Sequence, residues 1–257
     1  MESIAGRVAL VTGGGRGIGR AIALALAREG ASVALAARSV PELEQVASEV
    51  QALGRRAFFL PLDVLDRRAV ADAPATIARA LGPVDILVNN AGIHATGPIL
   101  RISDARWDGV LEVNLTAPFR LTRAFLPGMY DRGWGRVVNV ASVAGKIGVK
   151  YAAAYVASKH GLVGLTRTVA LEGGKKGVTA NAICPSWVET QMMDESIQAI
   201  VEATGRAADQ VRAAMLAENP SGRAASPEEV AEVAVLLARN PAINGQCIHV
   251  DGGEVQA

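Results

Sequence analysis

The sequence predicts an α/β protein in which a doubly wound sheet of seven mainly parallel strands carries helices on both faces. Short β-branched runs alternate with longer stretches of helical periodicity from Arg7 to about Val250, which is typical of repeated βαβ units. The strand runs are almost continuously apolar, as in Val8 to Val11, because a strand that is covered on both faces needs no polar alternation. These two observations together predict the fold class.

The individual elements follow from the same runs. Strands are expected near residues 7–12, 32–37, 57–61, 84–89, 135–141, 178–184 and 246–250, and helices near 17–29, 40–53, 66–80, 103–131, 153–173 and 227–239.

The chain is expected to form one domain over residues 1–257, because no linker rich in glycine, proline or serine divides it. The alternation of strands and helices is interrupted at about 186–222, where apolar residues have helical spacing without a strand. We interpret this segment as a helical insertion that forms a lid over a binding site.

The composition favours a small-molecule ligand. Half of the residues are apolar and the net charge is +1 at pH 7, so we expect neither nucleic acid nor a membrane as a partner. No apolar run reaches the roughly twenty residues of a membrane-spanning helix, and the N-terminal residues lack a secretion-signal pattern, so we expect a cytoplasmic protein.

Cys184 and Cys247 are expected to be buried thiols in a reducing compartment. No paired histidines or histidine–carboxylate cluster occurs, so no metal site is predicted.

A glycine-rich turn, Thr12-Gly13-Gly14-Gly15-Arg16-Gly17-Ile18-Gly19, connects the first strand and the first helix. Glycine permits a sharp turn and a close approach to a pyrophosphate, while the N–H groups and dipole of the new helix face the anion. The strand–turn–helix context therefore predicts a Rossmann-type dinucleotide site. The spacing differs from G-x-G-x-x-G, and a tight turn alone could also explain the glycines.

The end of the second strand bears on the choice of coenzyme. Many dinucleotide folds place an acidic residue there, but this chain has Ala36-Ala37-Arg38-Ser39. Arg38 could pair with a 2′-phosphate, and Arg16 could reach the same region, which favours NADP(H) over NAD(H). The alternative is that both arginines are solvated surface groups. Asp63 could accept from the adenine amino group or cap the helix that begins near Asp66.

Tyr155 and Lys159 are four residues apart in a helical stretch, so their side chains share one face. A neighbouring ammonium is expected to lower the pKa of tyrosine from roughly 10 toward the range useful for acid–base catalysis. Ser142 follows the apolar strand near 135–141, at the edge where doubly wound sheets place ligand contacts. By themselves, Tyr155 and Lys159 could be part of an ordinary helix face, and Ser142 could be a helix or loop cap. The surrounding motifs must therefore decide whether these residues are catalytic.

These motifs occur together and in order, and they resemble the short-chain dehydrogenase/reductase family over nearly the whole chain. Thr12-Gly13-x-x-x-Gly17-x-Gly19 resembles the coenzyme turn of the family, and Asn89-Asn90-Ala91-Gly92 resembles the motif that stabilises its central sheet. Pro185 with Thr190 resembles the loop around the nicotinamide, and Val250-Asp251-Gly252-Gly253 resembles the C-terminal motif. Asn114, Ser142, Tyr155 and Lys159 fall where the family has its catalytic tetrad.

The resemblance implies an NADP(H)-dependent oxidoreductase that interconverts a ketone, such as a 3-oxoacyl or polyketide-like carbonyl, and a secondary alcohol. Ser142 would bind the substrate oxygen, and Tyr155 would donate its proton as hydride arrives. Lys159 would lower the Tyr155 pKa and bind the nicotinamide ribose, while Asn114 would hold a helix distortion and a relay water. The coenzyme then supplies the redox chemistry and the protein supplies placement and proton management.

The resemblance also implies a set of coenzyme contacts and a homotetramer. The contacts are Gly13, Gly15, Arg16, Gly17, Ile18, Gly19, Arg38, Asp63, Val64, Asn90, Ala91, Gly92, Tyr155, Lys159, Pro185, Val188 and Thr190. Ser186 stands where the family often has glycine, so the backbone beside the nicotinamide is expected to follow a slightly different path.

Two resemblances point to different substrates. Residues 145–161 resemble polyketide ketoreductases and 3-oxoacyl reductases, whereas Trp187 and the insertion after Thr190 resemble 3-hydroxybutyrate dehydrogenases. An NAD-dependent alcohol dehydrogenase of the 3-hydroxybutyrate type is therefore one alternative. A non-catalytic dinucleotide-binding redox sensor is another, although the intact tetrad argues against it.

Three further side chains near the expected site have open roles. Trp187, Met192 and Met193 could wall an apolar substrate pocket or pack the core of the insertion. His94, on the loop after Asn89-Asn90-Ala91-Gly92, is expected to be solvated.

Overall fold

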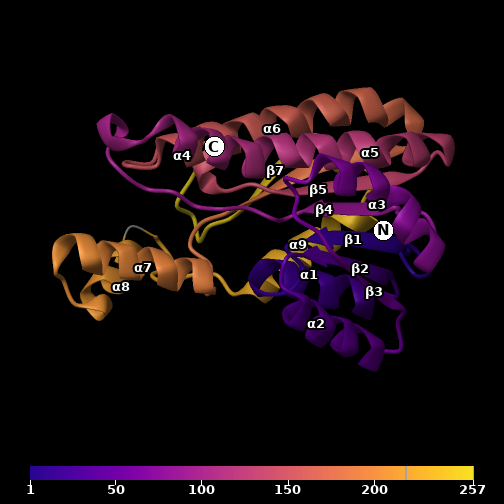
Figure 1. Cartoon of the computed structure of the whole chain (residues 1–257), viewed down its shortest axis with the longest axis horizontal. Helices are drawn as coiled ribbons and strands as arrows, with labels where there is room; N and C mark the ends of the chain where they lie inside the picture. Colours follow the sequence, from indigo (N-terminus) through magenta and orange to yellow (C-terminus); the bar gives the residue numbers. More distant parts are fainter. Residues whose placement is uncertain (218, 257) are drawn as a thin grey trace.

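The computed structural model describes residues 1–217 and 219–256, and its centre is a seven-stranded sheet (Figure 1). The strands are β1 (Val8–Thr12), β2 (Ser32–Ala37), β3 (Ala57–Pro61), β4 (Ile86–Asn89), β5 (Gly135–Val140), β6 (Val178–Pro185) and β7 (Cys247–Val250). They are arranged in the order β3-β2-β1-β4-β5-β6-β7, and every neighbouring pair is parallel. The predicted doubly wound α/β fold is confirmed.

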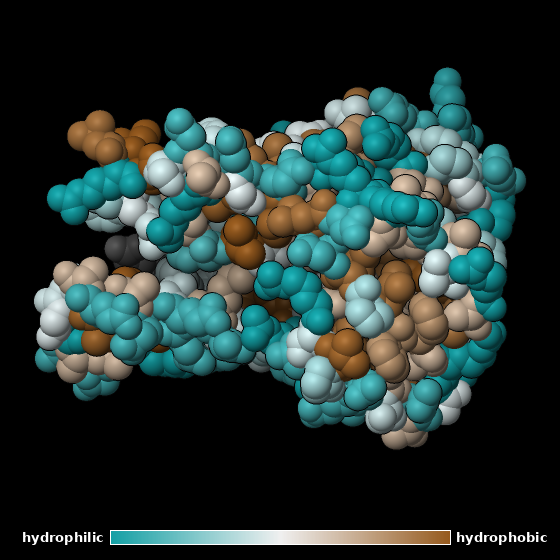
Figure 2. Space-filling model, viewed as in Figure 1, coloured by the Kyte–Doolittle hydropathy of each residue, from teal (hydrophilic) through white to brown (hydrophobic). Residues whose placement is uncertain are grey.

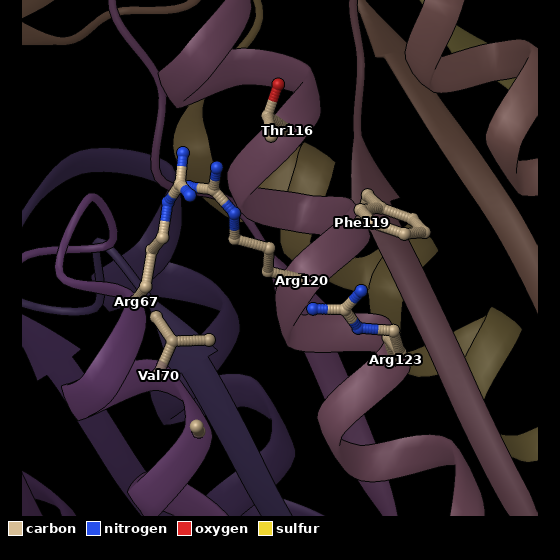
Figure 3. Close-up of a pocket in the computed structure, with 7 residues that line it drawn as sticks. Arg67, Val70, Thr116, Phe119, Arg120 and Arg123 are labelled. Carbon is tan, nitrogen blue, oxygen red and sulfur yellow. The ribbon is translucent and has the colours of Figure 1, made fainter.

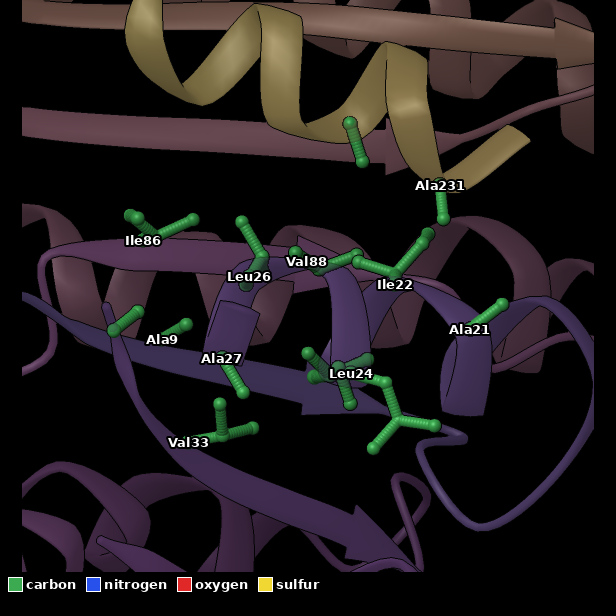
Figure 4. Close-up of a cluster of buried hydrophobic side chains, with 14 of the residues drawn as sticks. Ala9, Ala21, Ile22, Leu24, Leu26, Ala27, Val33, Ile86, Val88 and Ala231 are labelled. Carbon is green, nitrogen blue, oxygen red and sulfur yellow. The ribbon is translucent and has the colours of Figure 1, made fainter. Parts of the chain in front are cut away.

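Two layers of helices bury the sheet. The first layer consists of α1 (Gly17–Arg28), α2 (Val40–Ala52) and α9 (Pro227–Arg239), whose buried side chains share one apolar cluster. The opposite layer consists of α3 (Arg67–Ala80), α5 (Ala117–Asp131) and α6 (Ala153–Gly173), which share a second cluster. Figure 4 shows side chains of the first cluster from α1, α9 and the strands below them. Burial on both faces explains why the strands are continuously apolar.

The predicted helix 103–131 is divided in the structure. It consists of α4 (Asp104–Leu111), a π-helical segment at Glu112–Thr116 and α5. A π-helical turn adds one residue within a continuous helix, so the strand and helix pattern did not show it, although the family resemblance implied a helix distortion held by Asn114. Asn114 lies within this segment and is completely buried.

The segment between β6 and α9 forms an arm of two helices, α7 (Gln191–Thr204) and α8 (Ala208–Ala217), which projects from the sheet (Figure 1, orange). The arm has a small core of its own in which Met193, Ile197 and Val211 are buried and Trp187 is partly buried. Met192 is 42% exposed. Trp187 and Met193 therefore pack the insertion, which was one of the two interpretations left open for them.

Among the described residues, no helix combines the length and the apolar character that crossing a membrane requires.

Candidate active site

The carboxyl ends of four adjacent strands bring together motifs that are far apart in the sequence. β1 leads into the glycine-rich turn, β4 into Asn90, β5 into Ser142, and β6 ends at Pro185. Because all of these strands are parallel, their carboxyl ends lie along one edge of the sheet, where doubly wound proteins bind ligands.

The glycine-rich turn packs against the loop after β4 without room for side chains. Gly13 has a φ of +63°, and a Cβ there would lie 2.8 Å from Nδ2 of Asn90. A Cβ on Gly19 would collide with the carbonyl oxygen of Gly13. Thr12 Oγ1 accepts hydrogen bonds from the backbone N–H groups of Asn90 and Ala91 at 3.0 and 3.1 Å. The turn is thus held rigidly at the edge of the sheet.

The start of α1 fits an anionic group. Its N-cap residue, Arg16, makes no side-chain hydrogen bond to the first turn of the helix, so no side chain caps its N–H groups. Together with the side-chain-free cradle of glycines, this helix end can hold a pyrophosphate close to the backbone. The residues present therefore fit a dinucleotide coenzyme.

The base of the arm closes against the same turn. Arg16 Nη1 donates a hydrogen bond to Oε1 of Gln191 at 2.6 Å and lies 3.7 Å from a carboxylate oxygen of Glu42. A Cβ on Gly17 would lie 3.3 Å from the Thr190 methyl group. Thr190 Oγ1 donates a hydrogen bond to the Val188 carbonyl oxygen at 3.1 Å. Two distant segments thus bring together four predicted site residues, namely Arg16, Gly17, Val188 and Thr190.

The two predicted adenosine-side residues differ in their surroundings. Arg38 follows β2 and is exposed, and no ion pair or side-chain hydrogen bond joins it to another described residue. Asp63 Oδ1 accepts from the Leu65 N–H at 3.0 Å, whereas Asp66 accepts from Arg68 and Ala69 and is the N-cap of α3. Asp63 is therefore not the cap of that helix, which removes the structural alternative considered for it.

Ser142, Tyr155 and Lys159 converge at the ends of β5 and α6. The Tyr155 side chain lies beside Ser142, close enough for Ser142 to affect its pKa, and Ser142 Oγ donates a hydrogen bond to the Pro185 carbonyl oxygen at 3.4 Å. Lys159 Nζ donates to the Val140 carbonyl oxygen at 2.8 Å and lies 5.6 Å from the centroid of the Tyr155 ring. A phenol, a hydroxyl and an ammonium thus share one buried corner of the site.

Burial dominates the acid–base properties of this corner. Desolvation raises the pKa of Tyr155, although the hydrogen bond with Ser142 acts in the opposite direction. Desolvation also lowers the pKa of Lys159 to about 8. The structure thus corrects the expectation that Lys159 lowers the tyrosine pKa. The ammonium is directed to the Val140 carbonyl oxygen rather than to the phenol, and both groups lose their hydration.

Asn114 ties three segments together. Its Nδ2 donates to the Ile93 carbonyl at 2.9 Å and to Ser158 Oγ at 3.1 Å, and its Oδ1 accepts from the Ile93 N–H at 2.9 Å. Ser158 Oγ in turn donates to the Tyr155 carbonyl at 2.7 Å. The Asn114 side chain is therefore occupied in positioning the loop after β4 and the first turns of α6. Ser158 was not predicted, and its only sequence signal was its place beside Lys159.

His94 is not the solvated residue expected from its loop position. Its ring packs edge-on against Tyr155, with ring centroids 5.1 Å apart at 82°. Burial, with the charge of Arg106 nearby, lowers the pKa of His94, so its neutral form is favoured near pH 7. No sequence spacing indicated this contact, because His94 lies on the loop after β4 and Tyr155 lies in α6.

Ser186, which stands where the family often has glycine, is held by the C-terminal segment. Its hydroxyl donates a hydrogen bond to the Glu254 carboxylate. Nearby, Asn219 Nδ2 donates to the Asp251 carbonyl at 2.8 Å. The C-terminal motif thus fixes the backbone that leads from β6 into the arm.

The space between the arm and the opposite rim is open. Figure 2 shows a hollow between the α7–α8 arm and the segment around α4, with apolar side chains on the outer rim. Ile99 and Leu100, which precede α4, are 73% and 96% exposed. This mouth can receive an apolar group from solvent.

A second cavity, of about 320 Å³, lies between α3 and α5 (Figure 3). Three arginines face it, namely Arg67, Arg120 and Arg123. None of its lining residues belongs to the predicted site. Over residues 1–217 and 219–256, no group of three or more histidine, cysteine, aspartate or glutamate side chains could hold a metal ion.

The sheet order and the glycine-rich turn define a dinucleotide-binding α/β protein of the Rossmann class. Residues 7–200 match the short chain dehydrogenase family. The chain is 38% identical over 255 residues to a D-beta-hydroxybutyrate dehydrogenase of Cupriavidus necator, covering 97% of this chain and 98% of that protein. It is 37% identical over 250 residues to the 3-oxoacyl-(acyl-carrier-protein) reductase FabG of Escherichia coli, covering 96% and 97%.

Among solved structures, the chain resembles an actinorhodin polyketide ketoreductase with NADPH, with a TM-score of 0.93, 39% identity and 99% coverage of both chains. The protein therefore belongs to the short-chain dehydrogenase/reductase family and is an oxidoreductase of that family.

We expect Gly19→Ala to destabilise the protein, because the added methyl group meets the Gly13 carbonyl oxygen and the Asn90 amide. The free energy of unfolding should fall by about 1–3 kcal/mol, as measured by urea denaturation. Gly109→Ala in α4 is the matched control, since a Cβ there meets open space, and it should leave stability unchanged or raise it by up to about 1 kcal/mol. Equal effects of the two changes would contradict the close packing of the turn.

Proposed function

We propose that this protein is an NADP(H)-dependent oxidoreductase that interconverts a ketone and a secondary alcohol, with Tyr155 as the acid–base residue. The observation that carries the proposal is the proximity of the Tyr155 and Ser142 side chains, with the Lys159 ammonium on the next helical turn. This pair of hydroxyls lies at the same sheet edge as the glycine-rich turn.

Each side chain has a role in this proposal. Ser142 Oγ donates a hydrogen bond to the carbonyl oxygen of the substrate and orients it toward Tyr155. The Tyr155 hydroxyl donates its proton to that oxygen during reduction and takes a proton back during oxidation. NADPH, when bound, supplies the hydride. Lys159 and Tyr155 would hold the nicotinamide ribose, and Asn114 acts by keeping the loop at Ile93 and α6 in place.

The acid–base properties favour reduction near neutral pH. A raised Tyr155 pKa keeps the phenol protonated, which is the form that donates to a carbonyl oxygen. The buried Lys159 retains its charge only below about pH 8, so the ammonium that would hold the nicotinamide ribose is present at neutral pH and lost above that value. We therefore propose ketone reduction as the favoured direction.

The preference for NADP(H) is supported by Arg38. This guanidinium is exposed at the end of β2 and has no acidic partner among the described residues, so it can pair with a 2′-phosphate. Arg16 is less free, because it contacts Gln191 and Glu42. The related polyketide ketoreductase structure contains NADPH, which agrees with this assignment.

The remaining coenzyme contacts are proposed by position. Gly13, Gly15, Gly17, Ile18 and Gly19 would face the pyrophosphate. Asp63, Val64, Asn90, Ala91 and Gly92 would contact the adenosine side, and Pro185, Val188 and Thr190 would enclose the nicotinamide.

For the substrate, we propose an apolar 3-oxoacyl or polyketide-like ketone. Apolar side chains lie at the outer rim of the hollow beside the arm (Figure 2), and His94 beside Tyr155 has a lowered pKa and is neutral near pH 7. A small hydroxy acid carries a carboxylate that would need a cation, and the charge of Arg106 near His94 is one that it could pair with. The 38% identical D-beta-hydroxybutyrate dehydrogenase keeps that class as the second candidate.

Comparing two ketones separates these candidates. The proposal expects acetoacetyl-N-acetylcysteamine to be reduced with a kcat/KM at least about tenfold higher than acetoacetate, and the reverse order would support the hydroxy-acid alternative. Bound coenzyme without turnover of any ketone would instead support the redox-sensor alternative.

The arm and the assembly complete the proposal. The α7–α8 arm would act as a lid over the bound substrate, because its base already contacts the glycine-rich turn through Arg16. We also propose a homotetramer in the cytoplasm, as the family resemblance implies.

Tyr155→Phe should lower kcat for ketone reduction by about 10²- to 10⁴-fold, because the proton donor is lost while the ring is retained. NADPH affinity, followed by fluorescence titration, should change by less than about tenfold, because only one hydrogen bond to the coenzyme ribose is lost. Tyr151→Phe is the control, since this tyrosine is 52% exposed, and it should keep the parental rate. Parental turnover by the Tyr155 variant would overturn the mechanism.

The pH profile of reduction should have an alkaline limb near pH 8. The Lys159 pKa is lowered from its ordinary value to about 8, so the charged form is complete below that pH and disappears above it. Measured kcat/KM should therefore fall as the pH rises from 7.5 to 9.5. A rate that stays flat over this interval would contradict a role for the Lys159 charge, and Lys159→Arg should move the limb to higher pH.

Arg38→Asp should change the coenzyme preference. Removing the guanidinium and adding a carboxylate should lower kcat/KM for NADPH relative to NADH by about 10- to 100-fold. Arg55→Asp makes the same charge change at an exposed position outside the site and should leave the ratio unchanged. A parental preference for NADH would contradict the coenzyme assignment.

A further inference from the structure

Cys184 and Cys247 are the two cysteines of the chain, and they lie on adjacent strands. Cys184 is buried near the end of β6, and Cys247 begins β7 and is half-buried. In the register of these strands, Ala182 pairs with Cys247 and Cys184 pairs with His249. Residues two apart point to the same face of a strand, so the two thiols face each other diagonally.

The packing confirms this arrangement. Cys184 is buried in an apolar cluster with Ala141, Leu162 and Val163, and Cys247 packs against the same cluster, so the two thiols are close enough to shift each other's pKa. Because the two thiols lie in one apolar pocket, each is placed to react with the other.

The two thiols differ in their electrostatic surroundings. The hydrogen bond from Cys184, together with the charges of Arg167 and Lys146, lowers the pKa of the Cys247 thiol to about 6. The same contact and burial raise the pKa of Cys184, which stays protonated. The half-buried Cys247 is therefore the thiolate and the nucleophile of the pair.

We propose that Cys247 and Cys184 form a peroxide-sensitive thiol pair that closes to a disulfide beneath the active site. The Cys247 thiolate attacks one oxygen of a hydroperoxide, the O–O bond breaks, and Cys247 becomes a sulfenic acid while hydroxide or alkoxide leaves. Cys184 then attacks the Cys247 sulfur, the S–O bond breaks, and water leaves as the disulfide forms. The two thiols are oxidised by two electrons in total, and the peroxide is reduced.

Closing the bond must disturb the site. A disulfide requires Cα atoms no more than about 7 Å apart, while diagonal neighbours on adjacent strands are typically about 7–8 Å apart. Cys184 also contacts the backbone of Ser142, and the next residue, Pro185, provides the carbonyl oxygen beside Ser142 Oγ. Drawing β6 toward β7 therefore displaces the hydroxyl that we propose to bind the substrate.

The bond itself can be tested by mass, independently of any activity. Purified protein is treated with hydrogen peroxide, unreacted thiols are blocked, and the intact mass is measured without reductant. The proposal expects a chain that loses two hydrogens, takes up no blocking group and runs as a monomer on a denaturing gel. Cys247→Ala should retain one blockable thiol under the same treatment. A product with both thiols blocked, with a persistent added oxygen or with an intermolecular bond would overturn the proposal.

The effect on turnover rests on the proposed function and is measured separately. Oxidation should lower kcat of ketone reduction about tenfold or more, since small displacements of reacting groups have effects of this size, and dithiothreitol should restore it. Cys247→Ala should start near the parental rate and resist peroxide. Disulfide formation without any change in kcat would overturn the link to the site. If the untreated protein reduces no ketone, the proposed function fails while the mass result still decides the thiol pair.

Discussion

The buried ammonium of Lys159 is the constraint on which the site depends. Burying an ammonium costs free energy unless its N–H groups have hydrogen-bond acceptors. Here Lys159 Nζ donates one hydrogen bond to the carbonyl oxygen of Val140. That hydrogen bond fastens α6 to the end of β5 and so sets the position of Tyr155 one turn earlier. The same burial lowers the lysine pKa to about 8. In the proposed function, the remaining N–H groups would bind a coenzyme ribose beside Tyr155, which would link coenzyme binding to proton transfer.

The parallel sheet places the other segments of the site along the same edge. Because adjacent strands run in the same direction, the glycine-rich turn after β1 and the loop after β4 leave the sheet side by side. Thr12 and Asn90 then hold the two segments together with short polar contacts, and the glycines leave no side chains between them. A rigid coenzyme side is thereby combined with an open substrate side, where the arm has only a small core of its own.

Strand β6 connects the two sides. It contains Cys184, ends at Pro185 beside Ser142, and continues through Ser186 toward the arm. Its neighbour β7 leads into the C-terminal segment, whose Glu254 holds Ser186. A covalent bond between β6 and β7 would therefore act where substrate positioning and arm attachment meet. This connectivity gives the proposed thiol pair an effect on turnover even though neither sulfur takes part in hydride transfer.

The sequence alone determined the class of fold, because continuous apolar strands and amphipathic helices have periodicities that can be read directly from the order of residues. It also located Ser142, Tyr155 and Lys159 as neighbours of strand and helix ends. The family resemblance implied a helix distortion at Asn114, which the structure shows as a π-helical segment. Only the tertiary structure decided that His94 packs on Tyr155 and that Cys184 faces Cys247. These contacts join residues from separate elements, and the sign of the Tyr155 pKa shift depends on burial, which no local spacing encodes.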